Sequence, residues 1–529
     1  MGLRSCAALL LVLWIPATAS AAIMLLRTYD GTVFGDEFGY SCVVVGDMDG
    51  DGIAEFVIGA PADDTGGENA GRVFIYRGGH PLGDAPSWVI TGMPGERLGH
   101  ALAAALVDDD YVPDLVIGAP GGPKAPYTPA GRVVIAFGGT PLGARPLASL
   151  AGTSDGGRFG WSVSGFTRWP SPALAFIVGA PEANTGAGEV HGIARGDPPA
   201  AARVFVLHGE TSGENLGYAI ADAGVTRGFP IGPEFVVGAP EASVGGASAG
   251  RLRLFLYDSP QDTVPDMVVN GSAAGARLGH SVTGGEDTNP NFFEPTDEFV
   301  AGAPGASSGG IAGAGAAEVF ADMSAPFSFN GAVPHAALGS TVRLFETVTG
   351  SVLADLAVGE SGAVRVYAGQ LSSSASPAAT LLADEAGDGF GHAISNSGRI
   401  EPAFTTHLQF LVGAPYHAGT GRVYVYSDPS PVTGVDSPRG LAGVRFGPPV
   451  PNPSGGAVSF AVQLPQTMPA RVAVFDLAGR EVARLHEGAL GPGRSAFKWD
   501  PRGGAAPGIY IAVLEADGVR LTWRVALLR

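Results

Sequence analysis

The strongest constraint on the fold of this chain is a short apolar segment that recurs seven times. Each copy ends in glycine, alanine and proline, or in a close variant of that ending. The copies are FVIGAP (56–61), LVIGAP (115–120), FIVGAP (176–181), FVVGAP (235–240), FVAGAP (299–304), LAVGES (356–361) and FLVGAP (410–415). Such periodicity indicates an array of similar supersecondary units that bury their apolar faces against one another.

A second element of the repeat, an aromatic residue or leucine followed by glycine, precedes each copy. These pairs are spaced by 52 to 62 residues and are Phe38-Gly39, Leu98-Gly99, Phe159-Gly160, Leu216-Gly217, Leu278-Gly279, Leu338-Gly339 and Phe390-Gly391. A strand that opens with glycine, such as GRVFIYRG (71–78), follows most copies, and a further apolar segment completes the repeat. Four strands per repeat is typical of a propeller blade. We therefore predict an all-β fold, with a seven-bladed β-propeller over residues 22–428.

The two ends of the array predict that the ring closes on itself. After the seventh GRVYVYSD segment (421–428) the fourth strand is missing, while a spare strand at 23–29 stands before the first repeat. Pairing the two would cover an open sheet edge, which is otherwise a site of aggregation.

The remainder of the chain reads as a linker and a second, smaller domain. Residues 429–445 are rich in proline, serine and glycine, which is typical of a linker. Residues 446–529 contain short alternating segments separated by turn residues, which favour a small Ig-like β-sandwich. The segments are 458–464, 471–477, 481–485, 495–499, 508–516 and 519–528.

The acidic loop before the first FVIGAP, GDMDGDGIAE (46–55), has the pattern of a calcium site. Carboxylates of Asp47, Asp49 and Asp51, the Ile53 carbonyl and Glu55 supply the hard oxygen ligands that Ca²⁺ prefers. A helix–loop–helix calcium motif needs a glutamate at its twelfth position. Here that position is Ile58, inside the strand, so this motif is excluded. A solvated acidic turn is the alternative, although so many carboxylates would repel one another without a counter-ion.

These features together resemble the FG-GAP repeat of the integrin α-subunit propeller, over roughly residues 23–428. The resemblance implies a seven-bladed ring with Ca²⁺ in blade-edge loops and a role in extracellular adhesion or ligand binding. Asp47, Asp49, Asp51, Ile53 and Glu55 occupy the matching metal positions.

The other repeats depart from this metal pattern. The second keeps Asp108, Asp110 and Asp114 but has Leu106 at the first position, which predicts a weak second site unless Asp109 substitutes. Later repeats retain at most an acidic residue just before the strand, as at Glu234, Glu298 and Asp355.

The C-terminal segments resemble bacterial sorting domains, namely the Ig-like domain of flagellar hook-capping proteins and the targeting domain of type IX secretion. The segments that carry the resemblance are VPNPSGG (450–456), VFDLAGREV (474–482), FKWDPRG (497–503) and PGIYIAVLEADG (507–518). The resemblance implies export across an outer membrane, with the secretion machinery as a partner.

The N-terminus predicts a secretory signal peptide over residues 1–21. Arg4 precedes an apolar run at 7–15, and the small residues at 19–21 allow cleavage before Ala22. The run is too short to span a membrane, and no other stretch is long and apolar enough. We therefore expect a bacterial protein that is secreted or at the cell surface, without a transmembrane segment. Cys42 would be the sole cysteine of the mature chain, so no internal disulfide is expected.

The net charge and the motifs favour binding over catalysis. A formal net charge of -19 argues against nucleic acid as a partner, and no hydrolase, metalloprotease or phosphate-loop motif is found. His100, His280 and His392 share a repeat position with tyrosine, tryptophan and serine, which indicates packing. Arg195-Gly196-Asp197 spells an adhesion tripeptide in a loop.

The leading hypothesis is a calcium-stabilised binding module for an extracellular protein or glycan. A secreted propeller enzyme acting on polysaccharide or lipid is an alternative, but it would need clustered charged residues or histidines in the central channel, and the sequence shows no such departure from the repeat. A purely structural surface protein is the third possibility.

Overall fold

The structure of the chain is a computed structural model that describes residues 23–527 with gaps. The gaps are 109, 111, 123–129, 167–173, 197–202, 225, 227–233, 257–262, 287, 289–296, 321–325, 347, 350–352, 370, 402–407, 428–444, 447–455, 465–466, 477–479, 492, 502–504, 507 and 517–518. The predicted signal peptide therefore lies outside the described residues. No helix in the described ranges is long and apolar enough to cross a membrane.

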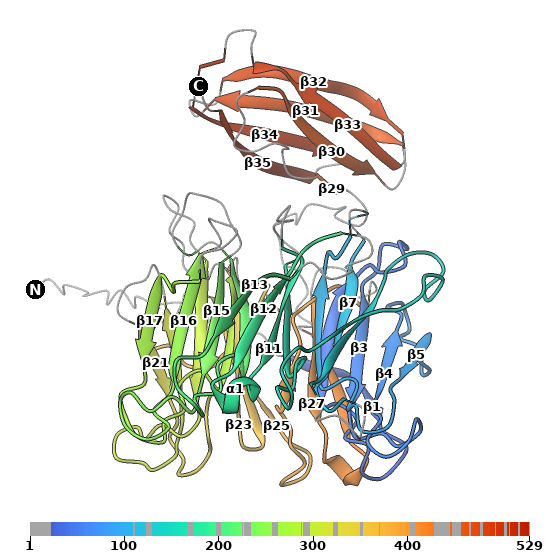
Figure 1. The fold of residues 1–529 in the computed structure, drawn as a ribbon. Helices are drawn as coiled ribbons and strands as arrows, with labels where there is room; N and C mark the ends of the chain where they lie inside the picture. Colours follow the sequence, from blue (N-terminus) through green and yellow to red (C-terminus); the bar gives the residue numbers. More distant parts are fainter. Residues whose placement is uncertain are drawn as a thin grey trace, which may run out of the picture. The chain divides into compact units, whose positions relative to one another are not determined.

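Seven four-stranded antiparallel sheets make up the first unit (Figure 1), and this confirms the predicted all-β fold. Six of them are formed by four consecutive strands. Blade 1 has β2 (Ser41–Gly46), β3 (Glu55–Ala60), β4 (Arg72–Tyr76) and β5 (Trp88–Thr91). Blade 2 has β6 (Ala101–Ala105), β7 (Asp114–Ala119), β8 (Arg132–Ala136) and β9 (Ala148–Ala151). Blade 3 has β10 (Ser162–Gly165), β11 (Phe176–Ala180), β12 (Glu189–Ile193) and β13 (Arg203–His208).

The remaining blades follow the same order. Blade 4 has β14 (Ala219–Gly224), β15 (Glu234–Ala239), β16 (Arg251–Leu256) and β17 (Met267–Asn270). Blade 5 has β18 (Ser281–Glu286), β19 (Glu298–Ala303), β20 (Ala316–Phe320) and β21 (Phe327–Asn330). Blade 6 has β22 (Thr341–Phe345), β23 (Asp355–Glu360), β24 (Ala363–Tyr367) and β25 (Ala379–Leu382). Two short helical segments, α1 (Ala183–Gly186) and a 3₁₀ turn at His417–Gly419, lie in loops.

Blade 7 closes the ring with the first strand of the chain. It consists of β26 (Ala393–Ile394), β27 (Gln409–Ala414), β28 (Arg422–Ser427) and β1 (Met24–Asp30). β1 pairs antiparallel with β28, with Tyr29 opposite Val423. The expected pairing of the N-terminal strand with the last GRVYVYSD segment is therefore confirmed. It covers the edge of the seventh sheet.

The glycine of the repeated ending has a steric role between repeats. A Cβ atom at Gly59 would lie 2.3 Å from the carbonyl oxygen of Gly99 and 2.2 Å from Ser41 Oγ. Any side chain at this position would separate neighbouring blades, which explains why glycine recurs there. Neighbouring blades also share apolar cores: Val57 and Ile75 of blade 1 belong to the same buried cluster as Leu115 and Ile117 of blade 2.

The chain divides into two compact units, and the main break falls between Ser430 and Pro431. In the second unit, β29 (Arg445–Phe446), β30 (Val458–Leu464) and β33 (Gly493–Trp499) form one sheet. The other sheet is formed by β32 (Glu481–Leu490), β31 (Met468–Asp476), β34 (Gly508–Ala516) and β35 (Val519–Leu527). Both sheets contribute to one buried core, with Phe460 and Val462 from the first and Val472 and Leu514 from the second. Its assignment as an Ig-like sorting domain stays a prediction.

Candidate metal centre

Three acidic side chains of the β2–β3 loop converge in the structure. A carboxylate oxygen from each of Asp47, Asp49 and Glu55 lies within 4.8 Å of the others. Glu55 is the first residue of β3 and is fully buried, Asp49 is buried and Asp47 is half-buried. Convergent carboxylate oxygens are the donor set that a hard divalent cation prefers, so these three residues fit the predicted Ca²⁺.

Asp51 is not part of this convergent group of side chains, and the Ile53 carbonyl stays a predicted ligand. The Asp51 side chain is exposed, and its Oδ1 accepts a hydrogen bond from the Ile53 amide at 2.8 Å. This is a local turn within the loop. Gly50 and Gly52, with φ of 81° and 91°, provide the left-handed backbone that the tight loop requires.

The loop is held from both sides by hydrogen bonds. The Met48 amide donates to Glu55 Oε2 at 2.6 Å. From blade 2, the Gly139 amide donates to the Met48 carbonyl at 2.7 Å, and the Thr140 hydroxyl donates to the Asp49 carbonyl. A cation bound at this loop would therefore stiffen the junction of blades 1 and 2.

One arginine stands beside the convergent carboxylates. Arg77 Nε lies 2.8 Å from Asp49 Oδ2, and the Arg77 side chain is 51% exposed. The guanidinium offsets part of the acidic charge. Because it is half in solvent, it can move aside at little cost when a divalent cation takes its place.

The second acidic loop, between β6 and β7, is already neutralised by the protein. Arg145 forms ion pairs with Asp108 and, at 3.7 Å, with Asp110. Burial tends to raise the pKa of Asp108, but the hydrogen bonds from Arg145 and Asp110 outweigh it and the pKa is lowered. Leu106, at the first ligand position, is buried and offers no ligand atom from its side chain, and Asp109 lies outside the described residues.

Asp114 in this loop has a structural role. Its two carboxylate oxygens accept hydrogen bonds from the Val107 and Gly138 amides, each at 2.9 Å. Burial raises the pKa of Asp114 to about 7, against the lowering effect of these two amides. Equivalent side chains in other blades accept hydrogen bonds from backbone amides of the preceding loop. The acceptors and donors are Glu234 from Thr226, Glu298 from Thr288, Asp355 from Val348 and Gln409 from Ile400. The acidic or amide residue before the strand is thus first a loop anchor, and within the described parts of these loops blade 1 alone adds two further buried or half-buried aspartates.

The histidines of the repeat lie in a row of aromatic contacts. His100 packs between Tyr40 and Trp161, with ring centroids at 5.0 and 4.5 Å, and its Nε2 lies 3.2 Å from the Tyr40 hydroxyl. Burial, followed by the Arg97 charge, lowers the pKa of His100 to about 3. Burial likewise lowers the pKa of His280 to about 4. Neutral, enclosed rings support the interpretation that these histidines pack between blades.

The Arg-Gly-Asp tripeptide is tied to the second acidic loop. Arg195 Nε donates to the Asp108 carbonyl at 2.8 Å, and the Gly196 amide donates to the Val107 carbonyl at 2.9 Å. Asp197 lies outside the described residues. The arginine and glycine therefore serve as a contact between blades 2 and 3.

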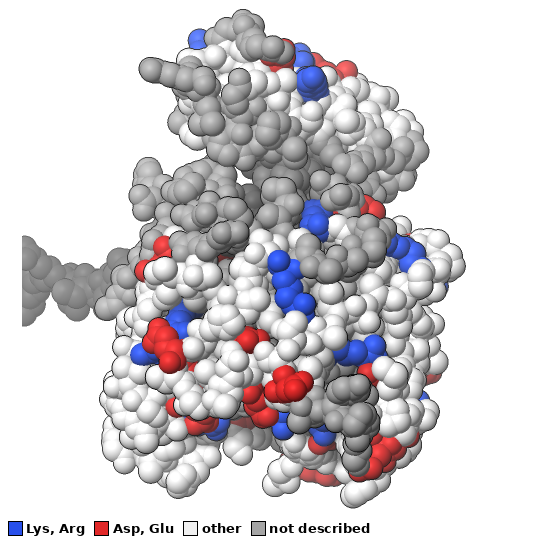
Figure 2. Space-filling view, in the orientation of Figure 1, with Lys and Arg blue, Asp and Glu red and all other residues white. Residues whose placement is uncertain are grey.

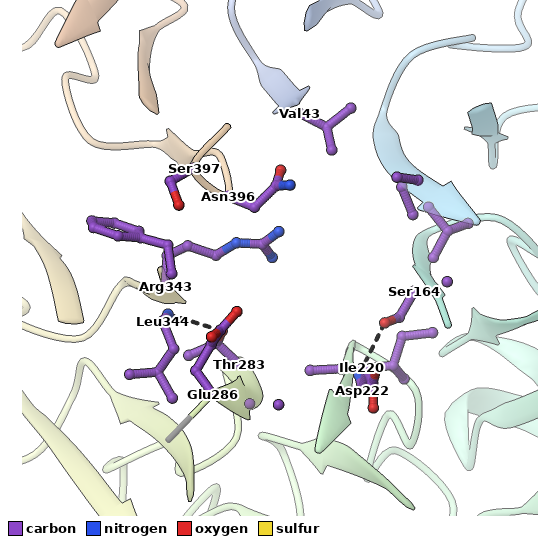
Figure 3. A pocket seen from close by; sticks show the side chains of 18 of the residues that line it. Val43, Ser164, Ile220, Asp222, Thr283, Glu286, Arg343, Leu344, Asn396 and Ser397 are labelled. Carbon is purple, nitrogen blue, oxygen red and sulfur yellow. Dashed lines mark hydrogen bonds between the residues drawn. The ribbon is translucent and has the colours of Figure 1, made fainter. Parts of the chain in front are cut away.

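A cavity of about 330 Å³ lies among the first strands of the blades (Figure 3). Its wall includes four charged residues, Asp222, Glu286, Arg343 and Glu346. The expectation that no charged cluster departs from the repeat in the central channel is therefore wrong. These charged residues can be recognised as departures from the repeat only when the first strands of the blades are aligned by their pairing register.

The comparisons with known proteins support the propeller assignment. Residues 38–76 match the FG-GAP repeat. This range contains the whole acidic loop and the first three strands of blade 1. Integrin alpha-5 of Xenopus laevis is 34% identical over 136 residues, and integrin alpha-7 of Homo sapiens is 35% identical over 135 residues. Each match covers 24% of this chain, but only 12% and 11% of those relatives, so the chain spans a small part of their length.

A further integrin relative and a solved structure also match this chain. Integrin alpha-PS2 of Drosophila melanogaster is 38% identical over 100 residues, which is 17% of this chain and 7% of that protein. Among solved structures, BBS1N in complex with ARL6DN, soaked with lead, is similar with a TM-score of 0.45 and 12% identity. That match covers 78% of this chain and 98% of the other. A likeness this weak carries no functional argument.

Proposed function

We propose that this chain is an exported, calcium-stabilised propeller that binds an extracellular protein or glycan, and that its C-terminal unit serves secretion sorting. The convergence of the Asp47, Asp49 and Glu55 carboxylates carries the calcium part of this proposal. The FG-GAP match and the integrin alpha relatives support the binding and adhesion part.

Calcium would act as a structural tie at this position. The loop that would hold it accepts hydrogen bonds from Gly139 and Thr140 of blade 2. A bound cation would therefore also stabilise the junction of blades 1 and 2. A ligand that binds only the folded state stabilises it by about 2.7 kcal/mol at a hundredfold excess over Kd. The ring would therefore be more resistant to heat and proteolysis in calcium-rich surroundings outside the cell.

The charge distribution supports a partner other than nucleic acid. On the face seen in Figure 2, the Lys and Arg side chains lie scattered among acidic ones and do not gather into one basic patch. A nucleic-acid surface would need clustered positive charge. Protein and glycan ligands have no such requirement.

Calorimetry and ligand screening test this proposal together. The full chain is titrated with Ca²⁺ beside two variants, Asp47→Asn in the convergent group and Asp155→Asn, an exposed aspartate of the loop between β9 and β10. We expect the parent and Asp155→Asn to bind Ca²⁺ and Asp47→Asn to lose binding. Glycan and extracellular-protein arrays, probed with calcium and with chelator, test the binding role. Turnover of a polysaccharide panel without retention of any ligand would instead support the enzymatic alternative.

A further inference from the structure

Arg343 is the residue that departs most from the sevenfold pattern of the first strands. The strand register places it opposite Ala357, at the same position as one residue in each other blade. Those residues are Val43, Ala103, Ser164, Ala221, Thr283 and Ser395. Six blades thus carry a small, uncharged residue where blade 6 carries a guanidinium. In that blade the residue opposite is alanine, whereas the partners in the other blades are valine, isoleucine or, opposite Ser395, leucine.

The Arg343 side chain points into the cavity among the first strands (Figure 3). Its Nε is buried and has no hydrogen-bond partner. Among the described residues, no carboxylate forms an ion pair with its guanidinium. Glu286 attracts the guanidinium electrostatically, but it forms no hydrogen-bonded ion pair with it. A buried charge without a hydrogen-bonded counter-ion is unfavourable, so the site is suited to an external carboxylate.

The neutral polar groups nearby are already engaged. Asn396 Oδ1 accepts from the Val44 amide at 3.0 Å, and its Nδ2 donates to the Val44 carbonyl at 2.8 Å. Thr283 Oγ1 accepts from the Leu344 amide at 3.1 Å, which leaves the hydroxyl hydrogen available to a ligand. The wall therefore holds its shape without using the guanidinium.

The acidic residues of the wall limit which anion can enter. Asp222, Glu286 and Glu346 contribute three negative charges to the lining against the single positive charge of Arg343. This balance disfavours a dianion such as phosphate and tolerates a single carboxylate, especially on a molecule that also carries an amine. A planar guanidinium matches a carboxylate through two parallel hydrogen bonds.

We propose that the cavity among the first strands binds a small molecule through one carboxylate group, which pairs with the Arg343 guanidinium. The volume of about 330 Å³ is at the lower end for ligand pockets and suits a molecule of amino-acid or sugar-acid size. This site lies apart from the calcium loop, so the inference does not rest on the proposed function.

Ligand-detected NMR titrations of the full chain with acetate, glycine and inorganic phosphate test the inference. The variants are Arg343→Met, Arg343→Lys and, as a matched control, Arg365→Met. Arg365 lies in the same blade but is paired with Glu360 at 2.9 and 3.1 Å. We expect acetate and glycine to bind the parent and Arg365→Met, to bind at least tenfold more weakly to Arg343→Met, and to bind Arg343→Lys with intermediate affinity.

Thermal melting without ligand separates a binding role from a structural one. Arg343→Met is expected to melt at or above the temperature of the parent, because it removes a buried unpaired charge, whereas Arg365→Met should melt lower. The inference is overturned if neither carboxylate binds the parent, if Arg343→Met binds as tightly as the parent, or if phosphate binds more tightly than both. Failure of Arg343→Met to fold would also overturn it, since it would show that the guanidinium supports the ring.

Discussion

The Met48 amide donates a 2.6 Å hydrogen bond to Glu55 Oε2, so the last residue of the acidic loop fixes the middle of the same loop. Glu55 is also one of the three convergent carboxylates. Its side chain therefore has two separable roles, as a loop anchor and as a cation ligand.

Substitutions at Glu55 should separate these two roles. Glu55→Gln keeps an oxygen acceptor for the Met48 amide but removes the charge, so calcium affinity should fall at least tenfold with little loss of stability in chelator. Glu55→Ala leaves a buried amide without its partner and should cost about 2 kcal/mol even in chelator. Chemical unfolding of both variants, with and without calcium, checks this. Equal stability of the two variants in chelator would show that the hydrogen bond has no anchoring role.

Removing Arg77 should strengthen calcium binding. Its guanidinium lies 2.8 Å from Asp49 Oδ2 and competes with a cation for that oxygen. Because Arg77 is half exposed, we expect a modest gain of about threefold to tenfold in affinity for Arg77→Met. The matched control is Arg97→Met, whose arginine pairs with Glu37 at 2.8 Å. Calorimetric titration should show unchanged affinity for the control, and an unchanged Arg77→Met would mean that the guanidinium does not oppose the cation.

The closure of the ring by β1 should be essential for stability. Tyr29 is buried against Phe56 and Tyr76, with ring centroids at 5.5 and 4.8 Å, and its hydroxyl donates to the Gly83 carbonyl at 3.0 Å. Tyr29→Ala should therefore cost about 3 kcal/mol, as is usual for a large buried aromatic. Leu25→Ala, at a 44% exposed position of the same strand, should cost little. Urea unfolding of the two variants with equal midpoints would contradict a structural role for the closing strand.

His100 should make the ring less stable in mild acid. Its folded pKa of about 3 lies below the unfolded value of about 6.5, so the unfolded chain takes up a proton that the folded chain does not. Protonation of His100 in the unfolded chain costs no folding stability above pH 6.5, and the free energy of unfolding decreases as the pH falls from 6.5 toward 3. At pH 4.5, two pH units below the unfolded pKa, the loss should be about 3 kcal/mol. His100→Phe should flatten the dependence of the melting temperature on pH over this range, whereas His335→Asn, at an exposed histidine, should not.

The repeat pattern predicted the ring because its cause is local and steric. A glycine equivalent to Gly59 stands in every repeat. The reason is steric, because the carbonyl of Gly99 in the next repeat lies against Gly59, and the recurring glycine is visible in the sequence. The pairing of β1 with β28 was predictable because the sequence has one spare strand before the first repeat and lacks the fourth strand of the last repeat. The ligand loop was also visible, but its electrostatic setting was not, because Arg77 and Arg145 come from other strands and loops.

Arg343 shows a different limit of sequence reasoning. In the segment TVRLF it looks like an ordinary outward residue of an alternating strand. Only the pairing of β22 with β23 shows that it shares a position with small residues of six other blades and faces a cavity. A residue that breaks a repeat is recognisable once the repeats are aligned by register.

The most direct test of the account is a calorimetric Ca²⁺ titration of the full chain and of Asp47→Asn, with melting measured in calcium and in chelator. We predict about one Ca²⁺ per chain for the parent, because Arg145 neutralises the second loop, with a melting temperature several degrees higher in calcium. Asp47→Asn should show neither binding nor this shift. No binding to the parent and identical melting in calcium and chelator would contradict a calcium-stabilised propeller.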